Sequence, residues 1–300
     1  MSQYEALSRQ FGHVKAVRFC QSEALYPQLT GSLPLIIVEN RLAKAVLSPY
    51  GAHIISFVPA GGPDLLWLSP LTKLVEGTPI RGGIPLCLPW FGPSPQGFPQ
   101  HGFARISNWQ VEEITERADG ATVLVLTLSD SEARRAMWPH AFTFRFEITV
   151  GTGLELTMSV KNQSQSDARF ELAFHTYFNV GDVKQTTIEG LDACTYVDRE
   201  DQQKRKKQVG LVAIKGTTTS LYVAVPNVQV VHSPLGDYRI DGTQDYCMVW
   251  NPGDLDKTVG DIGAGNHQGF LCAERLDAAE GAVTIHPGAS YTARMILSQA

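Results

Sequence analysis

The 300-residue chain lacks a long apolar run, an apolar stretch near its start and any CxxC pair among its five cysteines. A transmembrane helix needs roughly 18 consecutive apolar residues, and a secretory signal needs an apolar segment close to the N-terminus. We therefore expect no membrane association and a cytoplasmic location. An odd number of widely separated cysteines predicts reduced, mostly buried thiols rather than disulfides or a zinc ribbon.

A basic excess is missing as well. The 25 lysines and arginines stand against 30 aspartates and glutamates, a net charge of −5, so we expect no nucleic-acid partner. The histidines show neither HxH nor HExxH spacing, and there is no GxSxG motif, Walker loop or dinucleotide-binding glycine pattern. These absences predict neither a metal ion nor a cofactor. A hydrophobic content of 43% excludes disorder for most of the chain.

Alternation of apolar and polar residues is the strongest structural signal that is present. Residues 142–149 and 154–161 alternate on either side of Gly151-Thr152-Gly153, which predicts a hairpin of half-buried antiparallel strands. Ser129–Glu132 favours the start of a short helix that ends near Met137. We predict an all-β protein, one large antiparallel β-sandwich domain over residues 1–300 with a few short helices. Further strands are expected at residues 35–39, 43–47, 53–58, 109–115, 123–128, 221–225, 228–232, 247–250, 269–275 and 291–297.

Two loops differ in composition from their surroundings. Arg81–His101 is rich in proline and glycine, contains aromatic residues and has few charges, which is typical of a rigid loop that builds a site. Asp198–Lys207 carries eight charged residues and is interpreted as a solvated charged turn. A phosphate or nucleic-acid patch is the alternative interpretation of this second loop.

His175 and Glu274 are the candidate proton-transfer residues. If Arg169–Asn179 is a strand, its phenylalanines share one face and His175 lies on the other, which is either solvent-exposed or the floor of a cleft. A structural histidine and a general acid or base both fit this position. Glu274 lies in an otherwise apolar strand, where burial would raise its pKa. Pairing with Arg275 is disfavoured, because adjacent strand residues point to opposite faces.

Arg81 and Arg105 bracket the proline-rich loop. Two arginines that converge on a pocket suit a phosphate dianion, because each guanidinium is always charged and donates two parallel hydrogen bonds. Surface solvation or a structural ion pair is the alternative. His101 either hydrogen-bonds a ligand hydroxyl or fixes the loop.

Several motifs, in order along residues 35–297, resemble those of hexose-6-phosphate mutarotases, which are also called glucose-6-phosphate 1-epimerases. This family belongs to the galactose-mutarotase-like superfamily, and the resemblance implies its fold, a large antiparallel β-sandwich known as a supersandwich. The motifs are Arg81–Gly92, Gln100–Arg105, Trp138–His140, Phe174–Asp182, Val249–Gly253 and Cys272–Glu274.

The resemblance also implies roles for single residues. His175 matches the family's catalytic histidine and Glu274 its catalytic glutamate, while Arg81, Gln100 and Arg105 fall on substrate-binding positions. It implies that Glu274 removes the proton of the anomeric hydroxyl, that His175 protonates the ring oxygen, and that no cofactor takes part. One departure concerns Thr219, which stands where the family often has an aspartate that contacts the sugar.

Two other functions stay open from the sequence. A mutarotase for free aldoses would need no arginines for a phosphate, and a non-catalytic sugar sensor would need no acid and base. In either case aromatic residues such as Trp90, Phe91 and Trp250 could stack on a sugar. We expect a small-molecule sugar phosphate as the partner and a monomeric protein.

Overall fold

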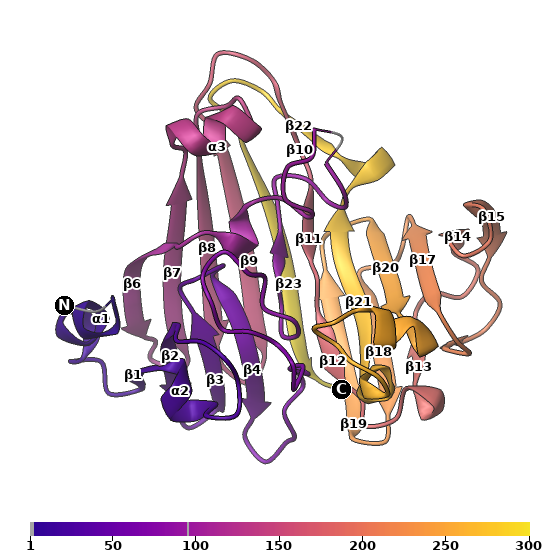
Figure 1. Ribbon diagram of the computed structural model, residues 1–300, viewed down its shortest axis with the longest axis horizontal. Coiled ribbons are helices and arrows are strands. Elements are labelled where there is room, and N and C mark those ends of the chain that lie inside the picture. The colour runs from indigo at the N-terminus through magenta and orange to yellow at the C-terminus, as the bar shows by residue number, and fades with distance from the viewer. Residues whose placement is uncertain (1–2, 95) are drawn as a thin grey trace.

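The computed structural model describes residues 3–94 and 96–300. Within these residues the chain folds mostly into antiparallel strands, which form one nine-stranded sheet, one eight-stranded sheet, one four-stranded sheet and one isolated pair (Figure 1). The prediction of an all-β fold with few helices is confirmed. The helices are α1 (Gln3–Phe11), α2 (Ser22–Leu25) and α3 (Glu132–Met137), with 3₁₀ turns η1 (Ala104–Ile106), η2 (Val183–Gln185), η3 (Gly253–Thr258), η4 (Asn266–Gly269) and η5 (Ala279–Gly281).

The nine-stranded sheet contains the hairpin that the sequence predicts. Its two strands are β8 and β9, and Gly151 lies in the turn between them. Figure 1 shows β6, β7, β8, β9 and β23 side by side on the left of the molecule. In sheet order the strands are β16 (Val212–Ala213), β13 (Thr187–Glu189), β18 (Val228–Ser233), β19 (Gly236–Gly242), β23 (Ser290–Gln299), β9 (Leu154–Asn162), β8 (Phe142–Val150), β7 (Thr122–Ser129) and β6 (Gln110–Glu116).

Glu274 lies on a strand of the eight-stranded sheet, and His175 lies in the short gap between two of its strands, so residues 169–179 do not form one continuous strand. Strand β21 lies near the middle of this sheet and pairs with β20 on one side and with both β11 and β12 on the other. In sheet order the strands are β15 (Lys204–Lys207), β14 (Thr195–Asp198), β17 (Thr218–Val223), β20 (Tyr246–Asn251), β21 (Phe270–Asp277), β11 (Leu172–Phe174) and β5 (Leu86–Cys87), with β12 (Tyr177–Asn179) on β21 as well.

The remaining strands complete the sandwich. The four-stranded sheet consists of β1 (Val17–Gln21), β2 (Pro34–Glu39), β3 (Ala43–Ser48) and β4 (His53–Pro59), and β3 contacts β8 of the large sheet. The isolated pair joins β10 (Ala168–Phe170) to β22 (Val283–Ile285). One buried apolar cluster collects side chains from Leu7 near the start of the chain to Leu297 near its end.

Each further strand that the sequence predicts overlaps a strand of the structure. The predicted helix also forms, and its first turn is capped by the Ser131 hydroxyl, which accepts a hydrogen bond from the backbone N–H of Arg134. The interpretation of Asp198–Lys207 as a turn throughout is wrong, because Lys204–Lys207 form the edge strand β15. Its lysines stay solvated, and Lys206 lies 2.8 Å from Asp198. Lysines on an edge strand hinder pairing with other chains.

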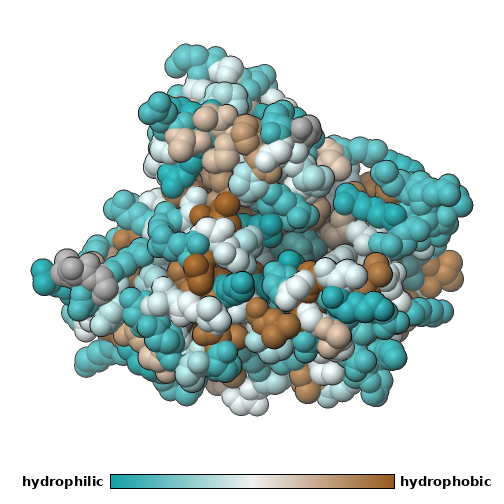
Figure 2. Space-filling model, in the orientation of Figure 1, coloured by the Kyte–Doolittle hydropathy of each residue, from teal (hydrophilic) through white to brown (hydrophobic). Residues whose placement is uncertain are grey.

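The molecular surface is polar, as expected when strands of alternating sequence bury their apolar side chains. The face drawn in Figure 2 is mostly hydrophilic, with apolar residues in small scattered groups. No helix among the described residues combines the length and the apolarity that crossing a bilayer requires.

Candidate active site

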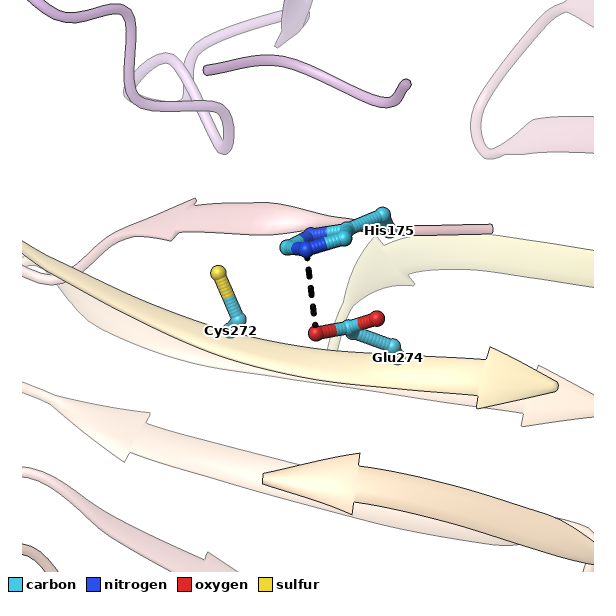
Figure 3. A group of neighbouring side chains, drawn as sticks. All are labelled: His175, Cys272 and Glu274. Atoms are coloured by element: carbon cyan, nitrogen blue, oxygen red, sulfur yellow. Dashed lines mark ion pairs between the residues drawn. The ribbon is translucent and has the colours of Figure 1, made fainter. Parts of the chain in front are cut away.

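Strand register places His175 across from Glu274. On either side of them, Phe174 pairs with Arg275 and Tyr177 pairs with Cys272. Counting inward from both pairs brings His175 opposite Glu274 on the same face of the sheet. His175 Nε2 and Glu274 Oε1 are 3.4 Å apart, and Figure 3 shows the ring above the carboxylate.

The two faces of these strands have the division that the sequence predicts. Phe174 packs in the main core, whereas His175 lies on the opposite face, where its ring stacks on Tyr177 at 4.9 Å. Arg275 also points away from Glu274 and donates to the carbonyl oxygens of Pro226 and Gly242. Glu274 therefore has no ion pair with its neighbour in sequence, as expected from strand geometry.

Burial dominates the electrostatics of the pair. The exposed fraction is 7% for His175 and 1% for Glu274. Burial holds the pKa of His175 well below its ordinary value, and the nearby His101 and Arg105 add to this. Burial raises the pKa of Glu274 well above its ordinary value, opposed by the Arg199 and Arg105 guanidiniums. Burial therefore favours the uncharged form of both groups, a neutral imidazole beside a protonated carboxyl.

Two polar atoms of the pair face the site without a partner. His175 Nδ1 and Glu274 Oε2 are buried and have no hydrogen bond to any described residue. Buried polar atoms are almost always hydrogen-bonded in proteins, so such exceptions indicate a functional site.

The proline-rich loop brings His101 close to His175. His101 has a φ of 63°, and its Nδ1 accepts a hydrogen bond from the Gly92 backbone N–H at 3.1 Å. Its ring lies 5.7 Å from that of His175. Burial, together with Arg105, lowers the pKa of His101 to about 3. His101 is therefore neutral at physiological pH. The Gln100 side-chain amide lies 3.2 Å from its Nε2.

The three arginines of the site differ in their partners. Arg81 Nη1 donates to the Tyr177 hydroxyl at 2.8 Å, and Arg81 Nε lies 3.1 Å from Asp261, so its charge is already paired. Arg105 donates to the Gln100 carbonyl oxygen at 2.8 Å, and its buried Nε has no partner. Neither Arg105 nor Arg199 forms an ion pair with a carboxylate within residues 3–94 and 96–300.

All six predicted site residues line one cavity of about 330 Å³. A volume at the lower end of the usual range for ligand sites suits a single sugar ring. Of the predicted stacking residues, Phe91 and Trp250 line this cavity, but Trp90 lies in a separate groove. The lining residues are Arg81, Phe91, Gly92, Pro93, Gln100, His101, Arg105, His175, Arg199, Thr219, Met248, Trp250, Val259 and Glu274.

Arg199 is the functional candidate that the sequence does not reveal. It follows the last residue of β14, and its backbone N–H donates to the Thr219 carbonyl oxygen at 3.0 Å, which fixes it beside the cleft. In the sequence it is one of eight charges in a stretch that resembles a solvated turn. Thr219 does line the cleft, and its hydroxyl donates to Glu200 at 2.6 Å.

Cys272, which is fully buried and does not line the cavity, adds a third potential metal ligand beside the pair. The donor atoms of His175, Cys272 and Glu274 all lie within 4.8 Å of one another. The spacing rules applied to the sequence detect only ligands close together in the chain, so they could not detect this group. A larger cavity of about 560 Å³ lies along β14 and β17, but the proton-transfer pair does not line it.

The architecture and the site together define a class. A buried imidazole–carboxylate pair that lines a sugar-sized cavity on an antiparallel β-sandwich has the groups that general acid–base chemistry requires. The model of the aldose 1-epimerase family matches residues 34–298, and the chain belongs to this family. The chain is therefore an isomerase of the mutarotase type, which acts in carbohydrate metabolism.

Individual relatives agree with this assignment. A protein of Escherichia coli (strain K12) named "Putative glucose-6-phosphate 1-epimerase" is 35% identical over 254 residues, covering 83% of this chain and 84% of the relative. The crystal structure of "a putative mutarotase" from Salmonella typhimurium superposes with a TM-score of 0.83 at 30% identity, covering 89% of this chain and 90% of that one. The galactose mutarotase-like protein of Lactobacillus casei, with a TM-score of 0.67 at 19% identity, covering 89% of this chain and 100% of that one, shares the fold.

Proposed function

We propose that this protein interconverts the α and β anomers of hexose 6-phosphates, with D-glucose 6-phosphate as the main substrate. Glu274 acts as the general base and His175 as the general acid. The observation that carries the choice of a phosphorylated sugar is the charge of the cleft, where two arginines face the ligand without a carboxylate partner among the described residues.

The charge of the cleft matches a phosphate dianion. Arg81 is paired with Asp261, so its charge is already compensated. Arg105 and Arg199 contribute two positive charges, and burial raises the pKa of the Glu274 carboxyl, which lines the same cavity, so its negative charge is disfavoured there. A free aldose would leave both charges uncompensated, whereas a phosphate monoester brings a charge of about −1.5 to −2 at pH 7.

Proton transfer needs one acid and one base on the same side of the sugar ring. In ring opening, the Glu274 carboxylate takes the proton of the anomeric hydroxyl, and the His175 imidazolium gives its proton to the ring oxygen. The open-chain aldehyde turns about its C1–C2 bond and presents the other face. Ring closure then runs with both proton transfers reversed, and the pair returns to its first state.

The uncharged pair that burial favours has the same total number of protons as the charged pair of imidazolium and carboxylate that opens the ring. An imidazole beside a protonated carboxyl is the form that closes the ring, and the charged pair is the form that opens it. The two forms differ by one proton moved between atoms that are 3.4 Å apart in the structure. Arg199 and Arg105 favour the carboxylate, which lowers the cost of forming the charged pair.

A coupled assay tests the proposal. Freshly dissolved α-glucose 6-phosphate is mixed with excess dehydrogenase that consumes only the β anomer, and the lag before NADPH appears reports spontaneous anomerisation. We expect catalytic amounts of the protein to abolish the lag and to leave free glucose unaffected. If free glucose is converted equally well, the protein is an aldose mutarotase. If it binds the sugar phosphate but the lag persists, it is a sensor.

Variants test the two catalytic roles. His175→Ala and Glu274→Ala should each lower the rate by roughly 10²–10⁴-fold with the fold intact, because each removes a positioned proton carrier. The exposed pair His232 and Glu189, 3.0 Å apart and outside the cleft, offers a matched control. His232→Ala should keep full activity. Near-normal activity of either catalytic variant would refute its role.

A further inference from the structure

We propose that His175, Cys272 and Glu274 form an inhibitory binding site for a divalent zinc ion beside the cleft, which His175 and Glu274 line and Cys272 does not. The three side chains come from neighbouring segments of one sheet. Cys272 and Glu274 are two residues apart on β21 and so share a face, and Figure 3 shows both of them directed toward the ring of His175. Cys272 has no part in the proposed reaction.

The geometry suits a tetrahedral ion. Zinc binds nitrogen and oxygen ligands at about 2.0–2.2 Å, so two such ligands at tetrahedral corners lie about 3.3–3.6 Å apart. His175 Nε2 and Glu274 Oε1 are 3.4 Å apart, and all three donor atoms lie within 4.8 Å of one another. Small side-chain adjustments of Cys272 would bring its sulfur to bonding distance.

The surroundings of the three donors also favour a ligand. All three side chains are buried, and no protein group beyond this pair holds the His175 ring or the Glu274 carboxyl, because His175 Nδ1 and Glu274 Oε2 lack hydrogen-bond partners among the described residues. A set of thiolate, imidazole and carboxylate selects zinc over magnesium and calcium, which prefer oxygen ligands alone. Three protein ligands leave the fourth position open toward the cleft, as in catalytic zinc sites.

Ionisation of the ligands balances the charge of the ion. Binding as thiolate and carboxylate brings two negative charges against the two positive charges of zinc, and the displaced protons pass to solvent. The guanidiniums of Arg105 and Arg199 repel the cation, so we expect a reversible inhibitory site rather than a permanently loaded one.

Inhibition follows from what the ion occupies. A bound ion holds the lone pair of His175 and the carboxylate of Glu274, so neither group can exchange a proton with the sugar. This consequence rests on the proposed catalytic roles. Binding itself does not, so it is measured separately from activity.

Cobalt(II), which replaces zinc and is coloured, gives the direct readout. We expect titration of the wild-type protein with Co²⁺ to produce a thiolate-to-cobalt charge-transfer band, and Zn²⁺ to displace it. The Cys272→Ala variant should lose the band and need about tenfold more Zn²⁺ for half-inhibition. Cys194→Ala, which removes a half-buried free thiol outside the cleft, should behave as wild type.

Other results would refute the proposed zinc site. Absence of the band in the wild-type protein would do so, as would a band that survives Cys272→Ala or is lost in Cys194→Ala. Should Cys272→Ala fail to fold, His175→Ala takes its place and must weaken cobalt binding in the same way. If the band behaves as expected but no hexose phosphate is converted, the metal site stands and the proposed reaction fails.

Discussion

Replacing Arg199 by glutamine should raise the KM for glucose 6-phosphate about fivefold, with little change in kcat. A hydrogen bond between a guanidinium and a phosphate is worth about 1.5–3 kcal/mol when shielded from water. Arg199 is exposed, so screening reduces this to about 1 kcal/mol, and each 1.4 kcal/mol corresponds to a factor of ten. Arg105 is half-buried and has an unpartnered Nε, so Arg105→Gln should cost more, about 30-fold or 2 kcal/mol.

The assay compares KM values over a range of salt concentrations. The Debye length shortens from about 30 Å at 0.01 M to about 8 Å at 0.15 M, so the exposed Arg199 should lose its advantage as salt rises. The half-buried Arg105 should keep most of its effect. Reversible mutarotation of the free sugar, if measurable, should respond to neither substitution.

A cation of the same hairpin provides the control. Arg205 pairs with Glu280 at 2.7 Å and does not line the cleft. Arg205→Gln removes one positive charge from nearly the same region of the surface, so it reports any non-specific attraction of the substrate. If Arg199→Gln and Arg205→Gln change the KM equally, the assignment of Arg199 to the phosphate is wrong. If Arg105→Gln also has no effect, phosphate recognition by this cleft is refuted as a whole.

Burial and backbone geometry lead to three more predictions. The pKa of Glu274 is raised in the folded state, so its contribution to stability is present below about pH 4.5 and is lost as the pH rises. The free energy of unfolding of Glu274→Gln should therefore rise relative to wild type between pH 4 and pH 8, by about 1.4 kcal/mol for each tenfold fall in the acid dissociation constant on folding. Denaturant unfolding at several pH values measures this difference, and a constant difference would contradict the prediction. In NMR titrations of the free protein His175 should stay neutral below pH 6.5, whereas His232, whose pKa two carboxylates raise, should titrate above it; the reverse order would refute the effect of burial. Gly102→Ala should cost more stability than Gly97→Ala and lower activity, because both have a φ of 75° but only at Gly102 would a new Cβ meet a carbonyl oxygen; equal losses of Tm would show that this contact is unimportant.

The sequence alone determined where most of the long strands lie and which face several site residues occupy. Alternation over residues 142–161 determined the hairpin of β8 and β9, because a half-buried strand must place every second side chain in the core. The same rule separated His175 from Phe174 and Glu274 from Arg275. Short strands with irregular alternation, such as β1 and β13, carry no clear local signal. The edge strand Lys204–Lys207 was misinterpreted because all its residues are charged.

Contacts between distant segments were decided only by the tertiary structure. The register of β11 and β12 on β21 brings His175 within 3.4 Å of Glu274, and no local pattern encodes that distance. The same register places Cys272 beside them. The fold also decided which arginine of the cleft lacks a carboxylate partner. Asp261, far away in the sequence, pairs with Arg81, whereas no described carboxylate pairs with Arg199. Local periodicity fixes which face a side chain occupies, but strand pairing fixes which side chains meet.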